Sequence, residues 1–175
     1  GAAGIAARAR PGLKLHKDGI VGDLRERPIR HRLNARVRRA RRNQVTPITE
    51  SSLGDGIFNG LGWIANHGNY GIGSDSNIRI SAPLELATLE YSQRLKHRER
   101  NVMAAGPGST GMMLYTKALA GGAQALGRAS GAIKAGLWAD LAAINTDHPA
   151  LCALRPEQWL DGLIFAAPDG AITDL

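Results

Sequence analysis

The pattern of apolar positions is clearest between residues 83 and 103, where it predicts a long helix. Apolar residues recur there at spacings of three and four, which places them on one face of a helix. These residues are Leu84, Ala87, Tyr91 and Leu95. Pro83 suits the first helical position, and Ser81 can cap the helix just before it. The charged residues 94–100 are expected to form a solvated face of its distal half.

A second helix is predicted from Gly111 to Leu126, with Ser109 or Thr110 as its cap. Its small residues indicate tight packing against a neighbouring element. They are Ala118, Ala120, Gly121, Gly122 and Ala123. Five larger apolar residues are expected in the core: Met112, Met113, Leu114, Tyr115 and Leu119. Residues 106–111 match G-x-G-x-x-G, but a dinucleotide site requires a preceding strand, and here a helix precedes.

Shorter elements are predicted before the first long helix. Residues 45–49 are rich in β-branched side chains and read as extended, and residues 50–56 read as a loop. A short helix is expected at 61–65. Residues 70–73 are typical of a short buried strand that allows close backbone approach.

The tail of the chain is predicted to be built from short strands. The candidates are residues 139–144, 163–166 and 170–174. A small β domain over residues 131–175, appended to an α/β part at 45–130, fits this pattern.

Length and composition narrow the possibilities. The 175 residues can form a domain with a real core, but a complete (β/α)8 barrel typically needs about 250. Cys152 is the single cysteine, so an intrachain disulfide is impossible and a cytoplasmic location is favoured. No apolar run approaches the roughly 20 residues of a membrane span.

The positive charge is concentrated in residues 1–44, which we call the basic segment. It holds thirteen Lys/Arg and three Asp/Glu, a net charge of +10, whereas residues 45–175 carry −3. Clustered arginines between 36 and 42 could neutralise phosphates as a nucleic-acid arm. However, the segment lacks aromatic residues for base stacking and shows no DNA-binding motif. A solvated, irregular segment and an out-of-frame reading of GC-rich DNA are the other two interpretations.

Asp75 is the main candidate for chemistry. It lies among small polar residues directly after the strand predicted at 70–73. A carboxylate at the carboxyl end of a barrel strand can bind a metal and accept a proton from metal-bound water. An aspartate that forms an ordinary turn is the alternative, and the spacing does not decide between the two.

The histidines offer no metal-binding pattern. They are His16, His31, His67, His97 and His148, and no two of them form an H-x-H or H-x-x-x-H pair. The chain has no G-x-S-x-G nucleophile motif, and Cys152 has no evident activating partner.

Several stretches together resemble the formimidoylglutamate deiminase family of the metal-dependent amidohydrolase superfamily. They are residues 47–58 (PITESSLGDGIF), 71–77 (GIGSDSN), 86–95 (LATLEYSQRL), 118–127 (ALAGGAQALG) and 136–141 (GLWADL). The LEYSQRL part is specific to this family, and the similarity covers roughly residues 45–175.

The resemblance implies an α/β fold, namely the C-terminal portion of a (β/α)8 TIM-type barrel plus part of a small β-sandwich. It implies zinc, with Asp75 as the metal-binding and catalytic aspartate of the eighth strand, and it places Glu50 near the substrate. The family hydrolyses N-formimino-L-glutamate to N-formyl-L-glutamate and ammonia in histidine degradation. A cytoplasmic homodimer is expected by the same resemblance.

The chain departs from the family where the metal histidines belong. The family's H-x-H pair and its further histidines lie upstream of the matched region, and the basic segment does not resemble that part. We therefore expect a fragment with weak or absent zinc binding and no deiminase activity. The alternative function is a basic protein that binds nucleic acid or another partner and uses the α/β part as a scaffold.

Overall fold

The computed structural model describes residues 14–16, 19–21, 42–104 and 108–174, and it divides into two units, residues 1–39 and 40–175. In the first unit, β1 (Lys14–His16) and β2 (Gly19–Val21) pair antiparallel, with Leu15 opposite Ile20. The arginines at positions 36–41, on which the interpretations of the basic segment depend, lie outside the described residues.

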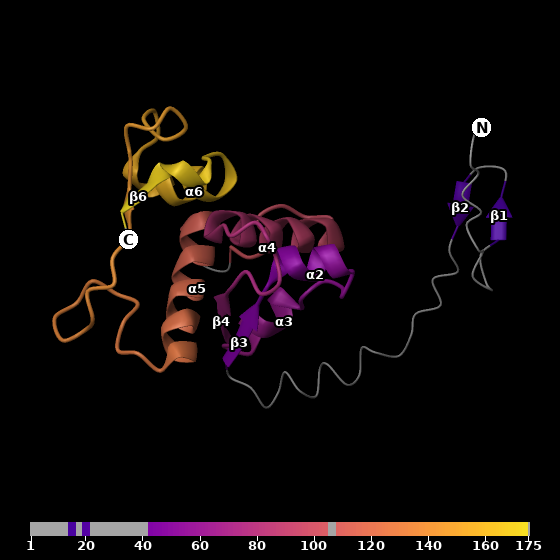
Figure 1. Ribbon diagram of the computed structural model, residues 1–175, viewed down its shortest axis with the longest axis horizontal. Helices are drawn as coiled ribbons and strands as arrows, with labels where there is room; N and C mark the ends of the chain where they lie inside the picture. Colours follow the sequence, from indigo (N-terminus) through magenta and orange to yellow (C-terminus); the bar gives the residue numbers. More distant parts are fainter. Residues whose placement is uncertain (1–13, 17–18, 22–41, 105–107, 175) are drawn as a thin grey trace, which may run out of the picture. The chain divides into compact units, whose positions relative to one another are not determined.

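The second unit is built on two parallel strands, β3 (Arg42–Val45) and β4 (Asn69–Ile72). In their register Val45 lies opposite Ile72, so both carboxyl ends reach the same edge. Tyr70 is fully buried, which confirms the buried strand predicted here. Strand β3 begins at Arg42, within the range that the sequence assigned to the basic segment. Figure 1 shows the two strands beside α5 and below α4.

Two short helices connect β3 to β4, and one corrects the sequence analysis. Helix α2 (Pro47–Leu53) occupies residues expected to be extended or looped, because Pro47 starts it and Gly54, at φ +72°, ends it. Helix α3 (Gly60–Ala65) confirms the short helix predicted at 61–65. Its N-cap is Asn59, whose side chain accepts a hydrogen bond from the Gly62 amide.

Helix α4 (Ala82–His97) starts as predicted, with Ser81 accepting from the Leu84 amide at 3.1 Å. The face predicted to carry the apolar residues is only partly buried: Ala87 is buried, whereas Tyr91 and Leu95 are exposed. The stripe that packs inward contains Leu86, Leu89, Glu90 and Gln93. It has the i, i+3, i+4, i+7 spacing of a buried face, but its two polar members concealed it in the sequence. Of the charged residues expected to be solvated, Lys96 and residues 98–100 are exposed, whereas Arg94 and His97 are half-buried and Arg94 pairs with Glu90.

Helix α5 (Thr110–Leu126) confirms the second long helix, and Ser109 caps it by accepting from the Met112 amide. The predicted close packing is also confirmed: a β-carbon at Gly121 would fall 2.0 Å from the carbonyl oxygen of Tyr70 on β4. Leu114 is fully buried, but Met112 and Leu119 are exposed, contrary to their predicted core positions.

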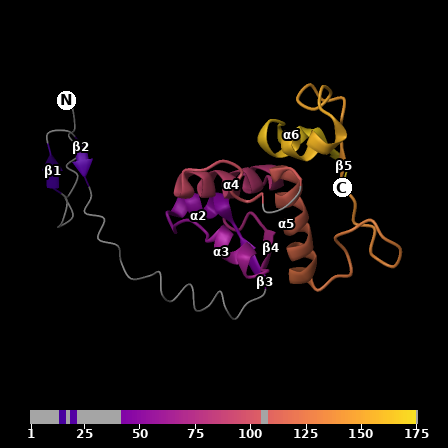
Figure 2. The same cartoon turned by 180° about the vertical axis from the view of Figure 1, so that it is seen from behind.

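The tail combines two short strands with a helix (Figure 2). Strands β5 (Ala143–Ile144) and β6 (Ile172–Asp174) pair antiparallel, which confirms the third predicted strand and only the end of the first. The strand predicted at 163–166 is wrong, because these residues lie in helix α6 (Trp159–Phe165) or directly after it. A short apolar run does not distinguish a strand from a buried helix. Two 3-10 turns, η1 (Pro156–Gln158) and η2 (Asp169–Ala171), flank α6.

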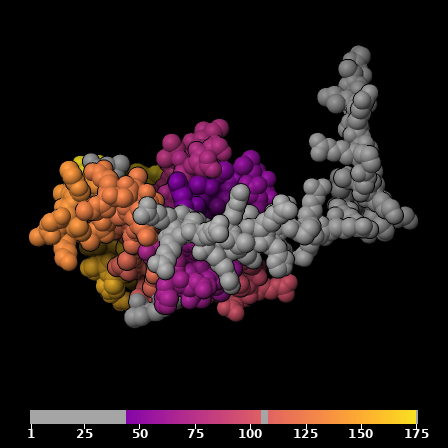
Figure 3. Space-filling view, turned by 90° about the horizontal axis from the view of Figure 1, so that it is seen from below, coloured from indigo at the N-terminus to yellow at the C-terminus, as the bar shows by residue number. Residues whose placement is uncertain are grey.

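The tail is attached to the starts of α4 and α5 by polar contacts, and it has a small apolar cluster of its own. The Gly111 amide at the start of α5 donates to Asp161 Oδ1 at 2.7 Å, and Ser81 donates to Asp169. Leu151, Leu163 and Ala171 form the buried cluster. The connecting segment 127–142 exposes apolar side chains, and its orange atoms lie at the surface in Figure 3. None of the described helices is long and apolar enough to cross a bilayer.

Candidate functional site at the carboxyl edge of β3 and β4

The carboxyl ends of β3 and β4 bring two loop segments together, and we call this place the carboxyl edge. The Gly73 amide donates to the Val45 carbonyl at 3.2 Å, which extends the strand pairing by one bond. Directly beyond, the Thr49 hydroxyl of α2 donates to the Ser74 carbonyl at 2.9 Å. The first turn of α2 is therefore attached to the segment that carries Asp75. Parallel α/β proteins place their ligand sites at this end of the strands.

Asp75 lies in a tight turn at the carboxyl edge. The turn is closed by the Asn77 amide, which donates to the Ser74 carbonyl at 2.9 Å. Asp75 has a φ of +46°, a left-handed conformation that aspartate tolerates better than most residues. Its side chain is exposed. The position after a buried strand agrees with the sequence analysis, and both the metal-ligand and the turn interpretation remain compatible with it.

Glu50 lies in the first turn of α2 and is half-buried. Its Oε1 accepts a hydrogen bond from the Thr46 amide at 3.2 Å, so the side chain bends back toward the start of the helix. Burial raises the pKa of the Glu50 carboxyl; the Thr46 hydrogen bond opposes this, and the nearby charge of Asp55 adds to it. Glu50 therefore holds a proton more readily than an exposed glutamate.

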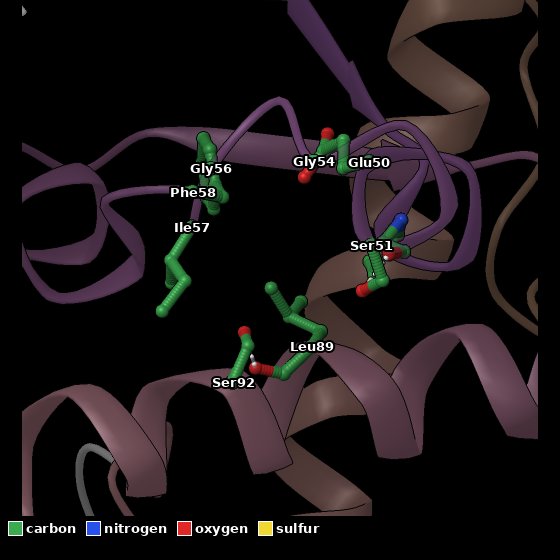
Figure 4. A pocket seen from close by; sticks show the side chains of 9 residues that line it. Glu50, Ser51, Gly54, Gly56, Ile57, Phe58, Leu89 and Ser92 are labelled. Carbon is green, nitrogen blue, oxygen red and sulfur yellow. Dashed lines mark hydrogen bonds between the residues drawn. The ribbon is translucent and has the colours of Figure 1, made fainter. Parts of the chain in front are cut away.

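Glu50 lines a cavity of about 200 Å³ between α2, α4 and the loop that follows α2. Figure 4 shows Leu89 and Ser92 projecting from α4 toward the cavity, with Ile57 from the loop and Ser51 from α2 around it. Pro47, Gly54, Gly56 and Phe58 complete the lining. The cavity therefore combines one carboxylate and two hydroxyls with an apolar wall, a lining suited to a small polar ligand.

The structure brings Asp75 and Glu50 to the same edge but not into the same cavity. Asp75 is not among the residues that line the cavity around Glu50. His67 precedes β4 and Asp75 follows it, so the strand separates the two side chains. In the part of the chain that the structure describes, no group of three or more His, Cys, Asp or Glu side chains could hold a metal ion.

Two buried glutamates of α4, which were not predicted from the sequence, support this region. Glu90 is completely buried; it accepts from the amides of Val102 and Met103 at 3.0 and 2.9 Å and pairs with Arg94 at 2.6 Å. Glu85 is 2% exposed and accepts from the Ile48 amide at 2.9 Å. Their positions beside Leu86 and Leu89 on one helical stripe were the available indication.

Gln93 of the LEYSQRL stretch also supports this region. Its side-chain nitrogen donates to the Phe58 carbonyl at 2.8 Å and so holds the loop that forms one wall of the cavity. Together with Glu90, it makes this stretch a support for two loops. No residue of LEYSQRL other than Leu89 and Ser92 lines the cavity itself.

Comparison with solved structures points to a class of enzyme. The chain is similar to an amidohydrolase from Brucella melitensis, with a TM-score of 0.66 and 45% sequence identity over 74% of this chain and 28% of that one. Among curated proteins, it is 41% identical over 128 residues to the formimidoylglutamate deiminase of Pseudomonas aeruginosa. That stretch is 73% of this chain and 28% of the relative. A comparison with protein-family models finds no match.

These similarities confirm the resemblance drawn from the sequence motifs, and they confirm a mixed α/β fold in the matched region. The chain spans little more than a quarter of the length of either relative. The described residues do not by themselves satisfy a metal site, because they place one exposed carboxylate, Asp75, where the resemblance implies several ligands. A structural or catalytic zinc site requires at least three protein ligands.

Proposed function

We propose that residues 40–175 correspond to the last part of a metal-dependent amidohydrolase barrel of the formimidoylglutamate deiminase type. In this proposal β3 and β4 are the seventh and eighth strands, and residues 131–175 contribute to the appended β-sandwich. The activity is hydrolysis of a C–N bond in N-formimino-L-glutamate, giving N-formyl-L-glutamate and ammonia. The observation that carries the proposal is the position of Asp75, directly after the second of two parallel strands, within a stretch 41% identical to such an enzyme.

Glu50 and its cavity are proposed to contact the substrate. The cavity is formed partly by α2, which begins next to the carboxyl edge, and its lining combines one carboxylate and two hydroxyls with apolar side chains. In this lining the Glu50 carboxylate can accept hydrogen bonds from the N–H groups of the substrate's formimino group. Glu50 would therefore orient the substrate, and Asp75 would supply the carboxylate closest to the reacting centre.

Zinc is the metal that this activity implies, but one carboxylate cannot hold it. We propose that the chain on its own binds zinc weakly and does not turn over formimino-glutamate. The homodimer and the cytoplasmic location expected from the resemblance remain part of the proposal. Size-exclusion chromatography with light scattering tests the first, and fractionation of the source cells tests the second.

A chimera tests the function directly. Residues 42–174 of this chain replace the matched section of the Pseudomonas aeruginosa enzyme, and ammonia release is measured with N-formimino-L-glutamate and with zinc. We expect turnover by the chimera and none by the isolated chain. A folded, zinc-loaded chimera that releases no ammonia would contradict the proposal, because the section would then be incompatible with the activity.

A further inference from the structure

Glu85 is a buried carboxylate outside the candidate site, and neither its burial nor its contacts follow from the proposed chemistry. It is 2% exposed on α4. One oxygen, Oε2, accepts from the Ile48 amide at 2.9 Å, and the other, Oε1, has no hydrogen-bond partner among the described atoms. Burying a carboxylate with one oxygen unpaired is unfavourable, so the contact that it does make needs an explanation.

The contact replaces the missing cap of α2. Thr46 is the N-cap residue, yet its side chain makes no capping hydrogen bond to the helix in the described structure. Ile48 is the second helical residue, and its amide is one of those that an N-cap side chain normally satisfies. Glu85 supplies this acceptor from α4, and a carboxylate also interacts favourably with the positive end of the helix dipole.

The turn that Glu85 holds connects directly to both candidate residues. Next to Ile48, the Thr49 hydroxyl donates to the Ser74 carbonyl at 2.9 Å, in the turn that carries Asp75. The following residue is Glu50, whose carboxylate receives the Thr46 amide and lines the cavity. Three consecutive residues of α2 thus contact α4, the Asp75 turn and the cavity.

We propose that Glu85 is a positioning residue that fixes the first turn of α2 against the carboxyl edge and thereby sets the positions of Glu50 and of the Asp75 turn. Its importance for catalysis rests on the proposed function, but its effect on the two segments does not. The acceptor, not the charge, performs this task. The unpaired Oε1 can carry a proton while Oε2 continues to accept from Ile48.

Two variants of similar size separate the acceptor from the charge. Glu85→Gln keeps an oxygen for the Ile48 amide, and Glu85→Met removes it. Hydrogen exchange of single amides, measured by NMR in the full chain, gives the readout. The amide of Ile48 reports on α2, that of Asn77 on the Asp75 turn, and that of Met113 on α5. Glu99→Gln, at an exposed position, controls for the loss of one charge.

We expect Glu85→Met to speed exchange at Ile48 and Asn77 by roughly fivefold or more, the factor for losing one hydrogen bond of about 1 kcal/mol. Exchange at Met113 should stay unchanged, and Glu85→Gln should behave like the parent chain. Unchanged exchange rates at Ile48 and Asn77 in Glu85→Met would overturn the proposal. An equal increase of these rates in Glu85→Gln and Glu85→Met would overturn it as well.

A second route applies if Glu85→Met does not fold. Thr49→Val removes only the hydroxyl that joins α2 to Ser74, so it should speed exchange at Asn77 and leave Ile48 protected. Unchanged exchange at Asn77 would then overturn the proposed connection.

In the chimera, Glu85→Met should lower kcat/KM and Glu85→Gln should not. If the parent chimera shows no turnover, the proposed function fails, while the exchange experiment still decides the role of Glu85.

Discussion

Glu90 shows how much of this structure depends on single buried charges. Its carboxylate accepts two amides of the loop after α4 and the Nε of Arg94. Glu90→Ala leaves these donors without their acceptor, and we expect a loss of about 3 kcal/mol in the free energy of unfolding, measured by urea denaturation. Glu99→Ala, at an exposed position, should change it by less than about 0.5 kcal/mol. Equal effects of the two variants would contradict this assignment.

Glu50 and Glu85 predict that the free energy of unfolding depends on pH. Burial raises the pKa of Glu85 and of Glu50 above 4.5, and the charge of Glu50 adds to the effect on Glu85. The folded state therefore binds more protons than the unfolded state between 4.5 and the raised values. This contribution to stability is fully present below pH 4.5 and is lost as the pH rises through the folded pKa values.

A double variant, Glu50→Gln with Glu85→Gln, isolates this contribution. The difference in unfolding free energy between the parent and the double variant should become less favourable to the parent as the pH rises from 4.5 toward 7. Urea denaturation at several pH values measures it, with Glu99→Gln as the matched single-charge control. A difference that increases with pH would contradict the direction of both pKa shifts.

The position of Asp75 could be predicted from the sequence, but the buried glutamates that support the loops around the site could not. Asp75 follows a buried strand, and that local pattern is readable without tertiary contacts. Glu85 and Glu90 are buried because α2 and the loop after α4 donate amides to them, and those partners are distant in the sequence. A buried glutamate looks like a surface residue until its partner is known.

Among the elements, the contact of α5 with β4 has the most restricted geometry. A β-carbon at Gly121 would meet the backbone of Tyr70 at 2.0 Å, whereas one at Gly122 would meet nothing within 4 Å. We expect Gly121→Ala to destabilise the fold by more than about 2 kcal/mol, because neither backbone can move away cheaply. Urea denaturation and thermal unfolding of Gly121→Ala and of the parent chain measure this loss of stability.

The neighbouring glycine provides the matched control. Gly122→Ala should be neutral or stabilising by up to about 1 kcal/mol, because alanine favours the helix and its methyl group has room. Similar losses in the two variants would show that α5 does not approach β4 as described.

The errors in the predicted elements share one cause. Residues 163–166 form an apolar run too short to distinguish a helix from a strand, and contacts of α6 with α4 and α5 decide for the helix. Residues 47–53 were expected to be extended or looped, but Pro47 and Gly54 delimit a helix whose first turn Glu85 caps from outside. Long periodic segments such as α5 were predictable because their pattern is repeated over several turns.

For the whole molecule, the charge division and the structural division fall close together. The basic segment ends at residue 44 by composition, and the second unit begins at Ala40. The second unit holds a parallel pair of strands. In parallel sheets helices normally cover both faces, and an edge strand leaves backbone groups that a further strand can pair with. In the same unit, Ile78 and Ile80 expose their side chains in the loop that follows the Asp75 turn.

The rate of ammonia release by the chimera, compared with its Asp75→Asn variant, tests whether Asp75 acts in the reaction. Asp147→Asn, an exposed aspartate in the tail, is the matched control for the substitution itself. We expect turnover of N-formimino-L-glutamate by the chimera and by Asp147→Asn, and its loss in Asp75→Asn with the fold retained. Full activity of the Asp75→Asn chimera would contradict it.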